Sequence, residues 1–159
     1  MIPTKCEQVL KHLAGKRLAT AESLTGGGIG AALTAVPGAS RVYAGGIISY
    51  TNAIKHKLLG VPVEALDTLG AVSGPVALAM AQGARKALDA DVAVSVTGLA
   101  GPDGDEFGHP VGTVFIGYAD DQTALAREYH FSGDREAVRN QTILAALELV
   151  LLQQNPTQP

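Results

Sequence analysis

The spacing of apolar and polar positions along the chain predicts alternating helices and strands. Near the N-terminus, Cys6, Val9 and Leu13 recur at the spacing of one buried helix face, with Thr4 as the expected N-cap. Similar spacing and capping signals predict helices over residues 6–13, 29–36, 52–59, 63–69, 74–88 and 134–152. Apolar and β-branched runs predict strands over residues 18–21, 42–50, 92–97, 113–119 and 125–131. The expected caps of three later helices are Thr51, Ser73 and Ser132.

The order of these elements predicts an α/β fold. Mostly alternating helices and strands favour a three-layer α/β/α sandwich with a mixed, mostly parallel sheet. The antiparallel part is expected near the end of the chain, where Asp120 and Asp121 lie in a hairpin turn. We expect residues 1–159 to form a single domain, with a frayed tail over about 153–159.

Composition narrows the classes of partner. The chain is 47% hydrophobic with a formal net charge of −3, so it carries no global basic field of the kind that nucleic-acid binders show. No apolar run approaches the roughly 18 residues of a membrane span, and the N-terminus has no apolar signal-peptide region. The single cysteine, Cys6, cannot form an internal disulfide, so we expect a reducing cytoplasm.

A cluster of hydroxyls and glycines follows the first predicted strand. Ser23 and Thr25 precede three consecutive glycines, Gly26 to Gly28, at the start of a helix, although glycine is a poor helix residue. In open α/β sheets, ligands bind outside the carboxyl ends of the strands, where glycine N–H groups can approach an anion. One interpretation is a Ser23 nucleophile beside an oxyanion site, and the other is a plain Ser23 or Thr25 cap with glycines for tight packing. A second hydroxyl, Thr97, ends another strand before Gly98 and Gly101.

Lys55 is the candidate base for such a nucleophile. At about 100° per residue, Lys55 lies between Ile54 and Leu59 inside the apolar arc of its helix, whereas Lys57 lies outside it. A lysine turned toward the core loses hydration, and its pKa falls toward that of a general base. The alternative is a lysine with a buried stem and a solvated amine. Tyr50, just upstream, could relay a proton or be a simple strand-end aromatic residue.

The histidines give no metal site. His12, His56, His109 and His130 are scattered without metal-ligand spacing, and we expect each to be exposed or hydrogen-bonded. The glycine pattern also fails the P-loop and dinucleotide fingerprints, and no serine lies in a G-x-S-x-G elbow.

Two further segments suggest ligand contacts. Arg135 and Arg139 lie at the start of the last helix, where the dipole disfavours cations unless an anion binds there or neighbouring acids balance them. Residues 98–112 form a long loop with five glycines and two prolines, which we expect to be a mobile cover over the site.

Six blocks of sequence together resemble the CinA C-terminal domain family. They are TAESLTGG, SYTNAIKHKLLGV, GAVSGPVA, SVTGLAGPDG, PVGTVFIGY and FSGDREAVR, and they span about residues 6–152 in the family's order. The resemblance implies a three-layer α/β/α fold and a metal- and cofactor-free amidohydrolase that converts nicotinamide mononucleotide to nicotinate mononucleotide and ammonia. It also implies a small-molecule substrate. From the net charge and the lack of a long apolar run we expect no nucleic-acid or membrane partner, and we expect a homo-oligomer.

The resemblance also assigns residues. It implies that Ser23 is the nucleophile and Lys55 its partner, supported by Tyr50 and Thr97. We expect the substrate to contact the backbone or side chains of Thr25, Gly26, Gly27, Gly98 and Gly101, and its phosphate to meet Arg135 or Arg139. The alternatives are a regulatory module that binds nucleotides without turnover, and an accessory protein in competence or DNA-damage response.

Overall fold

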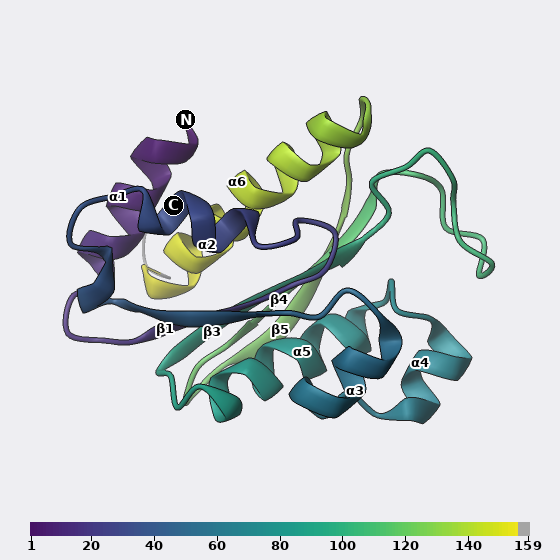
Figure 1. Cartoon of the computed structure of the whole chain (residues 1–159), viewed down its shortest axis with the longest axis horizontal. Coiled ribbons are helices and arrows are strands. Elements are labelled where there is room, and N and C mark those ends of the chain that lie inside the picture. Colours follow the sequence, from purple (N-terminus) through teal and green to yellow (C-terminus); the bar gives the residue numbers. More distant parts are fainter. Residues whose placement is uncertain (156–159) are drawn as a thin grey trace.

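The computed structural model describes residues 1–155, which form a five-stranded sheet between two layers of helices (Figure 1). The strands are β1 (Leu18–Glu22), β2 (Tyr43–Ile48), β3 (Val92–Gly98), β4 (Thr113–Ala119) and β5 (Ala124–His130), in the order β2-β1-β3-β4-β5. β1 pairs in parallel with β2 and β3, whereas β3–β4 and β4–β5 are antiparallel. The predicted mixed sheet is therefore confirmed. Its parallel and antiparallel pairings are equal in number, although only β4 runs against the other strands.

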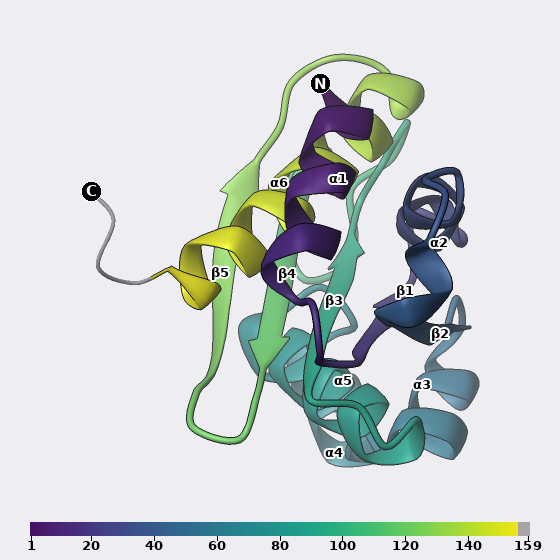
Figure 2. The same cartoon turned by 90° about the vertical axis from the view of Figure 1, so that its left-hand side faces the viewer.

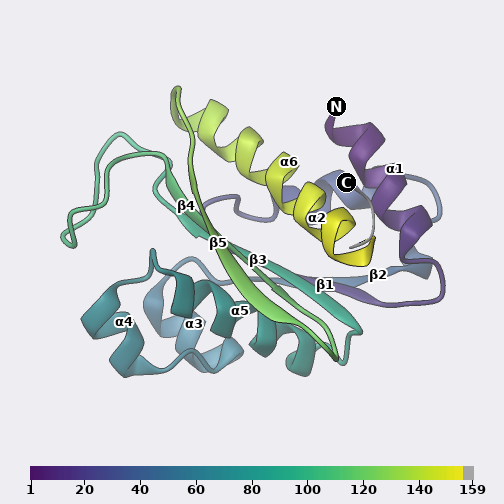
Figure 3. The same ribbon diagram turned by 180° about the vertical axis from the view of Figure 1, so that it is seen from behind.

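The helices cover the two faces of the sheet. α1 (Ile2–His12), α2 (Gly28–Thr34) and α6 (Arg135–Gln154) cover one face, with α1 and α6 side by side (Figure 2). α3 (Asn52–Leu59), α4 (Val63–Leu69) and α5 (Gly74–Ala87) cover the other (Figure 3), and a short 3-10 helix, η1 (Ala39–Arg41), precedes β2. Each face has its own apolar core, one around Leu13, Ile116 and Leu147 and the other around Val61, Met80 and Ala93. The three-layer prediction is confirmed.

Local capping signals set some helix ends as expected. Thr51 caps α3 by accepting a hydrogen bond from the Ile54 N–H at 3.4 Å, and Gly60 ends that helix at φ +69°. Ser73 caps α5 by accepting from the Val76 N–H. Both cap predictions are confirmed. They could be made from the sequence because a capping residue and the helix it caps are neighbours in the chain.

Other predicted helix boundaries were wrong. α1 begins at Ile2, so Thr4 lies inside the helix, because Pro3 in the first turn already has a helical φ. Asp134, and not Ser132, caps α6 by accepting from the Ala137 N–H at 2.9 Å. α6 reaches Gln154, so the tail expected to be frayed is helical at 153 and 154, and its last four residues lie outside the described part. Within residues 1–155, no helix is both long enough and apolar enough to cross a membrane.

Candidate active site

The parallel strands bring distant segments to one edge of the sheet. Glu22, the last residue of β1, pairs with Ile48 of β2 and with Val96 of β3. The residues that follow each strand end therefore meet, as expected for the carboxyl edge of an open α/β sheet. They open onto a cavity of about 360 Å³, whose lining includes Ser23, Tyr50, Lys55, Thr97, Gly101 and Arg135.

Ser23 and Lys55 form a direct contact in this cavity. The Lys55 Nζ donates a hydrogen bond to the Ser23 Oγ at 3.1 Å. Lys55 is only 1% exposed, so its amine is buried rather than solvated, and the prediction that it faces inward is confirmed. Burial lowers the pKa of Lys55 from 10.5 to about 8. No carboxylate lies within ion-pair distance of Lys55 in the described residues, so no opposite charge counters this desolvation.

Two backbone carbonyls fix the direction of the amine. Nζ also donates to the Ser49 carbonyl at 2.8 Å and to the Tyr50 carbonyl at 3.1 Å. A charged lysine has three N–H donors, which match these three partners. A neutral amine has two donors and one lone pair. If the two N–H groups stay on the carbonyls, the lone pair faces the Ser23 hydroxyl, which then becomes the donor.

Neither Ser23 nor Thr25 caps α2. The N-cap of α2 is Gly27, at φ +103° and without a side-chain cap. The N–H groups of the second and third helical residues are instead bound by the buried Glu22 carboxylate, which accepts from Ile29 at 2.8 Å and from Gly30 at 3.0 Å. Glu22 also accepts from the Thr25 hydroxyl at 2.6 Å. The interpretation of Ser23 or Thr25 as a plain N-cap of α2 is therefore wrong.

Sequence reasoning gave Glu22 no role. The signal that could have found it is an acidic residue immediately before a glycine-rich helix start, where the helix dipole favours a negative charge.

The glycines serve both turn geometry and packing. Gly26 and Gly27 have φ of +59° and +103°, which side chains rarely tolerate. A Cβ on Gly28 would lie 2.8 Å from the Ile143 side chain, so α2 packs closely on α6 there. Thr25, Gly26 and Gly27 are not among the residues that line the cavity, whereas Leu24, Gly98 and Gly101 are.

The turn after Ser23 leaves three backbone donors without partners in residues 1–155, and two of them, on Leu24 and Thr25, directly follow the serine. Among residues 1–155, the N–H groups of Leu24 and Thr25 donate no hydrogen bond. The next N–H group, that of Gly26, donates to the Ser23 carbonyl at 3.1 Å. Unpaired N–H groups beside a hydroxyl nucleophile are the donors that an oxyanion needs.

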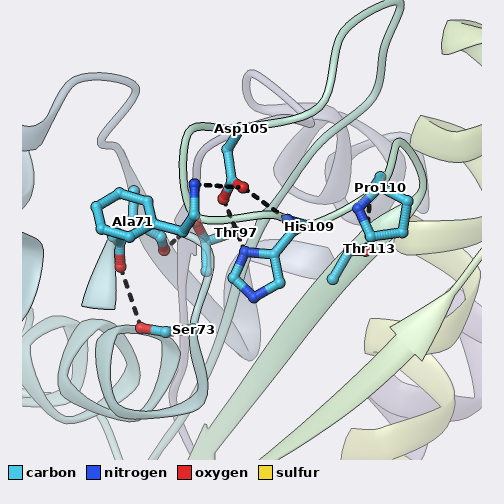
Figure 4. A network of polar contacts seen from close by, with 9 residues as sticks. Ala71, Ser73, Thr97, Asp105, His109, Pro110 and Thr113 are labelled. Carbon is cyan, nitrogen blue, oxygen red and sulfur yellow. Dashed lines mark hydrogen bonds and ion pairs between the residues drawn. The ribbon is translucent and has the colours of Figure 1, made fainter. Parts of the chain in front are cut away.

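Thr97 and Tyr50 border the cavity in different ways. The Thr97 hydroxyl donates to the Ala71 carbonyl at 2.8 Å, as the close-up shows (Figure 4), so toward the cavity it acts as an acceptor. Tyr50 is 62% exposed and contributes its carbonyl to Lys55.

The structure separates the two arginines. Arg135 lines the cavity, and its Nη1 donates to the Gly101 carbonyl at 2.6 Å. Arg139 is not part of the lining. Its Nε donates to the Leu24 carbonyl at 2.9 Å and its Nη2 to the Thr25 carbonyl at 3.1 Å.

The loop over residues 98–112 has an ordered base and tip. At its base, the Leu99 N–H donates to Thr113 and the Gly112 N–H donates to Leu99. At its tip, the Asp105 carboxylate accepts from the backbone and ring of His109 (Figure 4). Burial would raise the pKa of Asp105, but hydrogen bonds from His109 and Phe107 outweigh it and lower that pKa. The loop projects from the sheet, and residues 101–103 line the cavity, so its role as a mobile cover stays a prediction.

The histidines lie apart, and each is hydrogen-bonded close to its own place in the chain. The partners are the carbonyls of Gln8 and Val61 and the carboxylates of Asp105 and Glu128. Within residues 1–155, no three histidine, cysteine, aspartate or glutamate side chains gather as metal ligands would.

Known proteins resemble both the sequence and the fold. The CinA C-terminal domain model matches residues 3–153. A nicotinamide-nucleotide amidohydrolase, PncC, of Pseudomonas putida is 45% identical over 152 residues, covering 94% of this chain and 95% of that protein. A CinA-like protein of Parasynechococcus marenigrum is 49% identical over 87% of this chain, which spans only 34% of that longer relative.

Solved structures also resemble this chain in fold and sequence. The competence/damage inducible protein CihA of Agrobacterium tumefaciens has a TM-score of 0.92 at 39% identity, covering 97% of this chain and 95% of that one. A CinA superfamily protein of Escherichia coli has a TM-score of 0.92 at 37% identity, covering 96% and 90%. With a family model over nearly its whole length and a relative that it matches from end to end, this chain belongs to the CinA C-terminal domain family.

Proposed function

We propose that this protein is a nicotinamide-nucleotide amidase, which hydrolyses the carboxamide of nicotinamide mononucleotide to give nicotinate mononucleotide and ammonia. The observation that carries the proposal is the 3.1 Å contact between the Ser23 hydroxyl and the buried Lys55 amine at the edge of an open cavity. The near full-length match to the Pseudomonas putida amidohydrolase supports the choice of substrate.

The reaction begins with proton transfer from Ser23 to neutral Lys55. The freed alkoxide attacks the carboxamide carbon, and the carbonyl oxygen becomes an oxyanion. The N–H group of Leu24, which directly follows the nucleophile and has no partner within residues 1–155, donates to that oxyanion. Lys55 then returns the proton to the leaving nitrogen, and ammonia departs from an acyl-enzyme. Water, deprotonated by the same amine, hydrolyses the ester and regenerates Ser23.

Thr97 and Tyr50 orient the substrate. Because its own proton is held by Ala71, the Thr97 oxygen accepts a hydrogen bond from the carboxamide NH₂ and aligns it for attack. The exposed ring of Tyr50 at the cavity rim contacts the cationic pyridine ring, a pairing that aromatic faces favour. The direct contact between Ser23 and Lys55 makes a proton relay through either residue unnecessary.

Arg135 binds the phosphate group of the substrate. It lines the cavity at the first turn of α6, where the helix dipole also attracts an anion. Charge-assisted hydrogen bonds of this kind contribute about 1.5–3 kcal/mol, which is about tenfold or more in kcat/KM. Nicotinamide mononucleotide should therefore be preferred over nicotinamide riboside, and Arg135→Ala should narrow that preference by a similar factor.

Ammonia release tests the proposal. Wild type should release ammonia from nicotinamide mononucleotide faster than from the riboside or from free nicotinamide. Ser23→Ala should abolish release while the circular dichroism spectrum and the melting temperature stay near those of wild type. Ser40→Ala, an exposed serine on η1, is the matched control and should keep full activity.

Two other outcomes would support different functions. Binding of the nucleotide without ammonia release would indicate a regulatory module. Salt-dependent DNA binding would indicate an accessory protein in competence or damage response, which the net charge of −3 disfavours. A cytoplasmic location and a homo-oligomer complete the proposal, and light scattering of the purified protein tests the assembly.

A further inference from the structure

Arg139 holds the turn that follows the nucleophile. Its guanidinium donates from Nε to the Leu24 carbonyl at 2.9 Å and from Nη2 to the Thr25 carbonyl at 3.1 Å. It lies directly over this turn, since a Cβ placed on Gly26 would be 3.8 Å from Nη2. Among residues 1–155, no carboxylate lies within ion-pair distance of Arg139. Its charge therefore acts on peptide groups rather than on an acid.

The carbonyls that Arg139 binds are linked to the unpaired N–H groups, one through its own peptide unit and the other through one further hydrogen bond. The Leu24 carbonyl shares its peptide plane with the Thr25 N–H. The Thr25 carbonyl shares its plane with the Gly26 N–H, which donates to the Ser23 carbonyl at 3.1 Å. The Ser23 carbonyl in turn shares its plane with the Leu24 N–H. Two hydrogen-bonded chains thus start at one guanidinium, and each ends at an N–H without a partner in the described residues.

Such chains strengthen the terminal donor. Each bond in a hydrogen-bonded chain polarises the next, by about 10–30%. A cation at the head pulls electron density from the carbonyls, so the N–H groups at the far end carry more positive charge.

A buried carboxylate fixes the same turn from its other side. Glu22 is 2% exposed and accepts from the Thr25 hydroxyl at 2.6 Å, while its other contacts hold the start of α2. The peptides between Ser23 and Gly26 are therefore held through the Thr25 side chain by an anion and through their carbonyls by a cation.

We propose that Arg139 is a positioning residue that orients and polarises the oxyanion-binding peptides after Ser23, and that it does not bind the substrate's phosphate. This inference rests on the proposed amidase function. The two arginines, which are one helical turn apart, then have different roles. Arg135 binds the phosphate, whereas Arg139 acts through the backbone.

Kinetics on two substrates test this assignment. We expect Arg139→Ala to lower kcat by about 10- to 100-fold, somewhat less than the loss of an oxyanion donor itself. The loss should be equal on nicotinamide mononucleotide and nicotinamide riboside, and KM should stay within about twofold. Arg139→Lys, which keeps the charge and part of the donor set, should be intermediate. Arg127→Ala, an exposed arginine on β5, is the control and should match wild type.

Chemical rescue separates this role from a merely structural one. Guanidinium ions at non-denaturing concentration should restore part of the kcat of Arg139→Ala and should leave Ser23→Ala inactive. If Arg139→Ala does not fold, the comparison of the two substrates with Arg139→Lys carries the test.

Three results would overturn the inference. A loss of activity confined to the phosphorylated substrate would show that Arg139 binds the phosphate. An unchanged kcat in Arg139→Ala would remove its role in the oxyanion turn. A folded Arg139→Ala that guanidinium does not rescue would show that Arg139 has only a structural role. If wild type releases ammonia from neither substrate, the proposed function itself fails, which is a different outcome from an active wild type whose Arg139 variants change the substrate ratio.

Discussion

The buried amine of Lys55 should give this enzyme a steep dependence on pH. With a pKa of about 8, set by burial, the neutral base is about one tenth of the molecules at pH 7 and about nine tenths at pH 9. We expect kcat/KM to rise close to tenfold per pH unit below pH 7 and to level off above pH 9. An exposed lysine with a pKa near 10.5 would still be rising at pH 9.5.

The same burial predicts a pH-dependent stability. The pKa of Lys55 falls from 10.5 in the unfolded chain to about 8 in the fold, which corresponds to about 3 kcal/mol at 1.36 kcal/mol per unit. Below pH 8 both states are protonated, and the fold bears the full cost of the buried charge. Between pH 8 and 10.5 the unfolded chain binds more protons, so the free energy of unfolding rises with pH across this window.

Two measurements check these expectations. Initial rates of ammonia release between pH 6.5 and 9.5 give the activity profile, and urea unfolding at pH 7, 8.5 and 10 gives the stability. Lys55→Met should abolish activity and remove the lysine's share of the rise in stability. Lys57→Met, an exposed neighbour on α3, is the matched control and should keep both.

A flat kcat/KM between pH 6.5 and 9 would refute the reasoning. So would equal stability gains between pH 8 and 10 in wild type and Lys55→Met, because the gain would then belong to other groups.

Three further predictions concern stability and motion. The Ser49 hydroxyl is buried and has no partner within residues 1–155, so Ser49→Ala should raise the free energy of unfolding by about 1 kcal/mol in urea titration; a loss of that size would show that the hydroxyl is satisfied. A Cβ on Gly83 would collide with the Leu59 carbonyl, so Gly83→Ala should lower the free energy of unfolding by about 1–3 kcal/mol in the same titration, and an unchanged value would contradict this packing. Residues 98–112 should gain hydrogen-exchange protection when nicotinamide mononucleotide binds Ser23→Ala, whereas no gain anywhere in the loop would count against a cover.

Much of the fold follows from short-range sequence signals. The period of the apolar residues, the Thr51 and Ser73 caps and the glycine after α3 define elements whose cause and effect lie within a few residues. The inward direction of Lys55 follows in the same way, because its angle on the helix depends only on its neighbours. The hydroxyl at the end of β1 is also visible as a candidate nucleophile.

The partners of these residues depend on the packing of the layers. In the sequence, Arg135 and Arg139 are equivalent cations one turn apart, and only the placement of α6 sends one to the cavity and the other to the Leu24 and Thr25 carbonyls. Glu22 reaches the start of α2 because the turn after β1 folds back over the strand end.

The proposed catalytic pair needs the whole sheet. Ser23 and Lys55 are 32 positions apart, and the parallel pairing of β1 with β2 sets how they approach. The sequence by itself determined which side chains face inward and where most helices and strands lie, because those choices are local. The tertiary structure decided which inward-facing groups touch, and therefore which serine contacts a lysine, because such contacts depend on the register between strands that the sequence pattern leaves open.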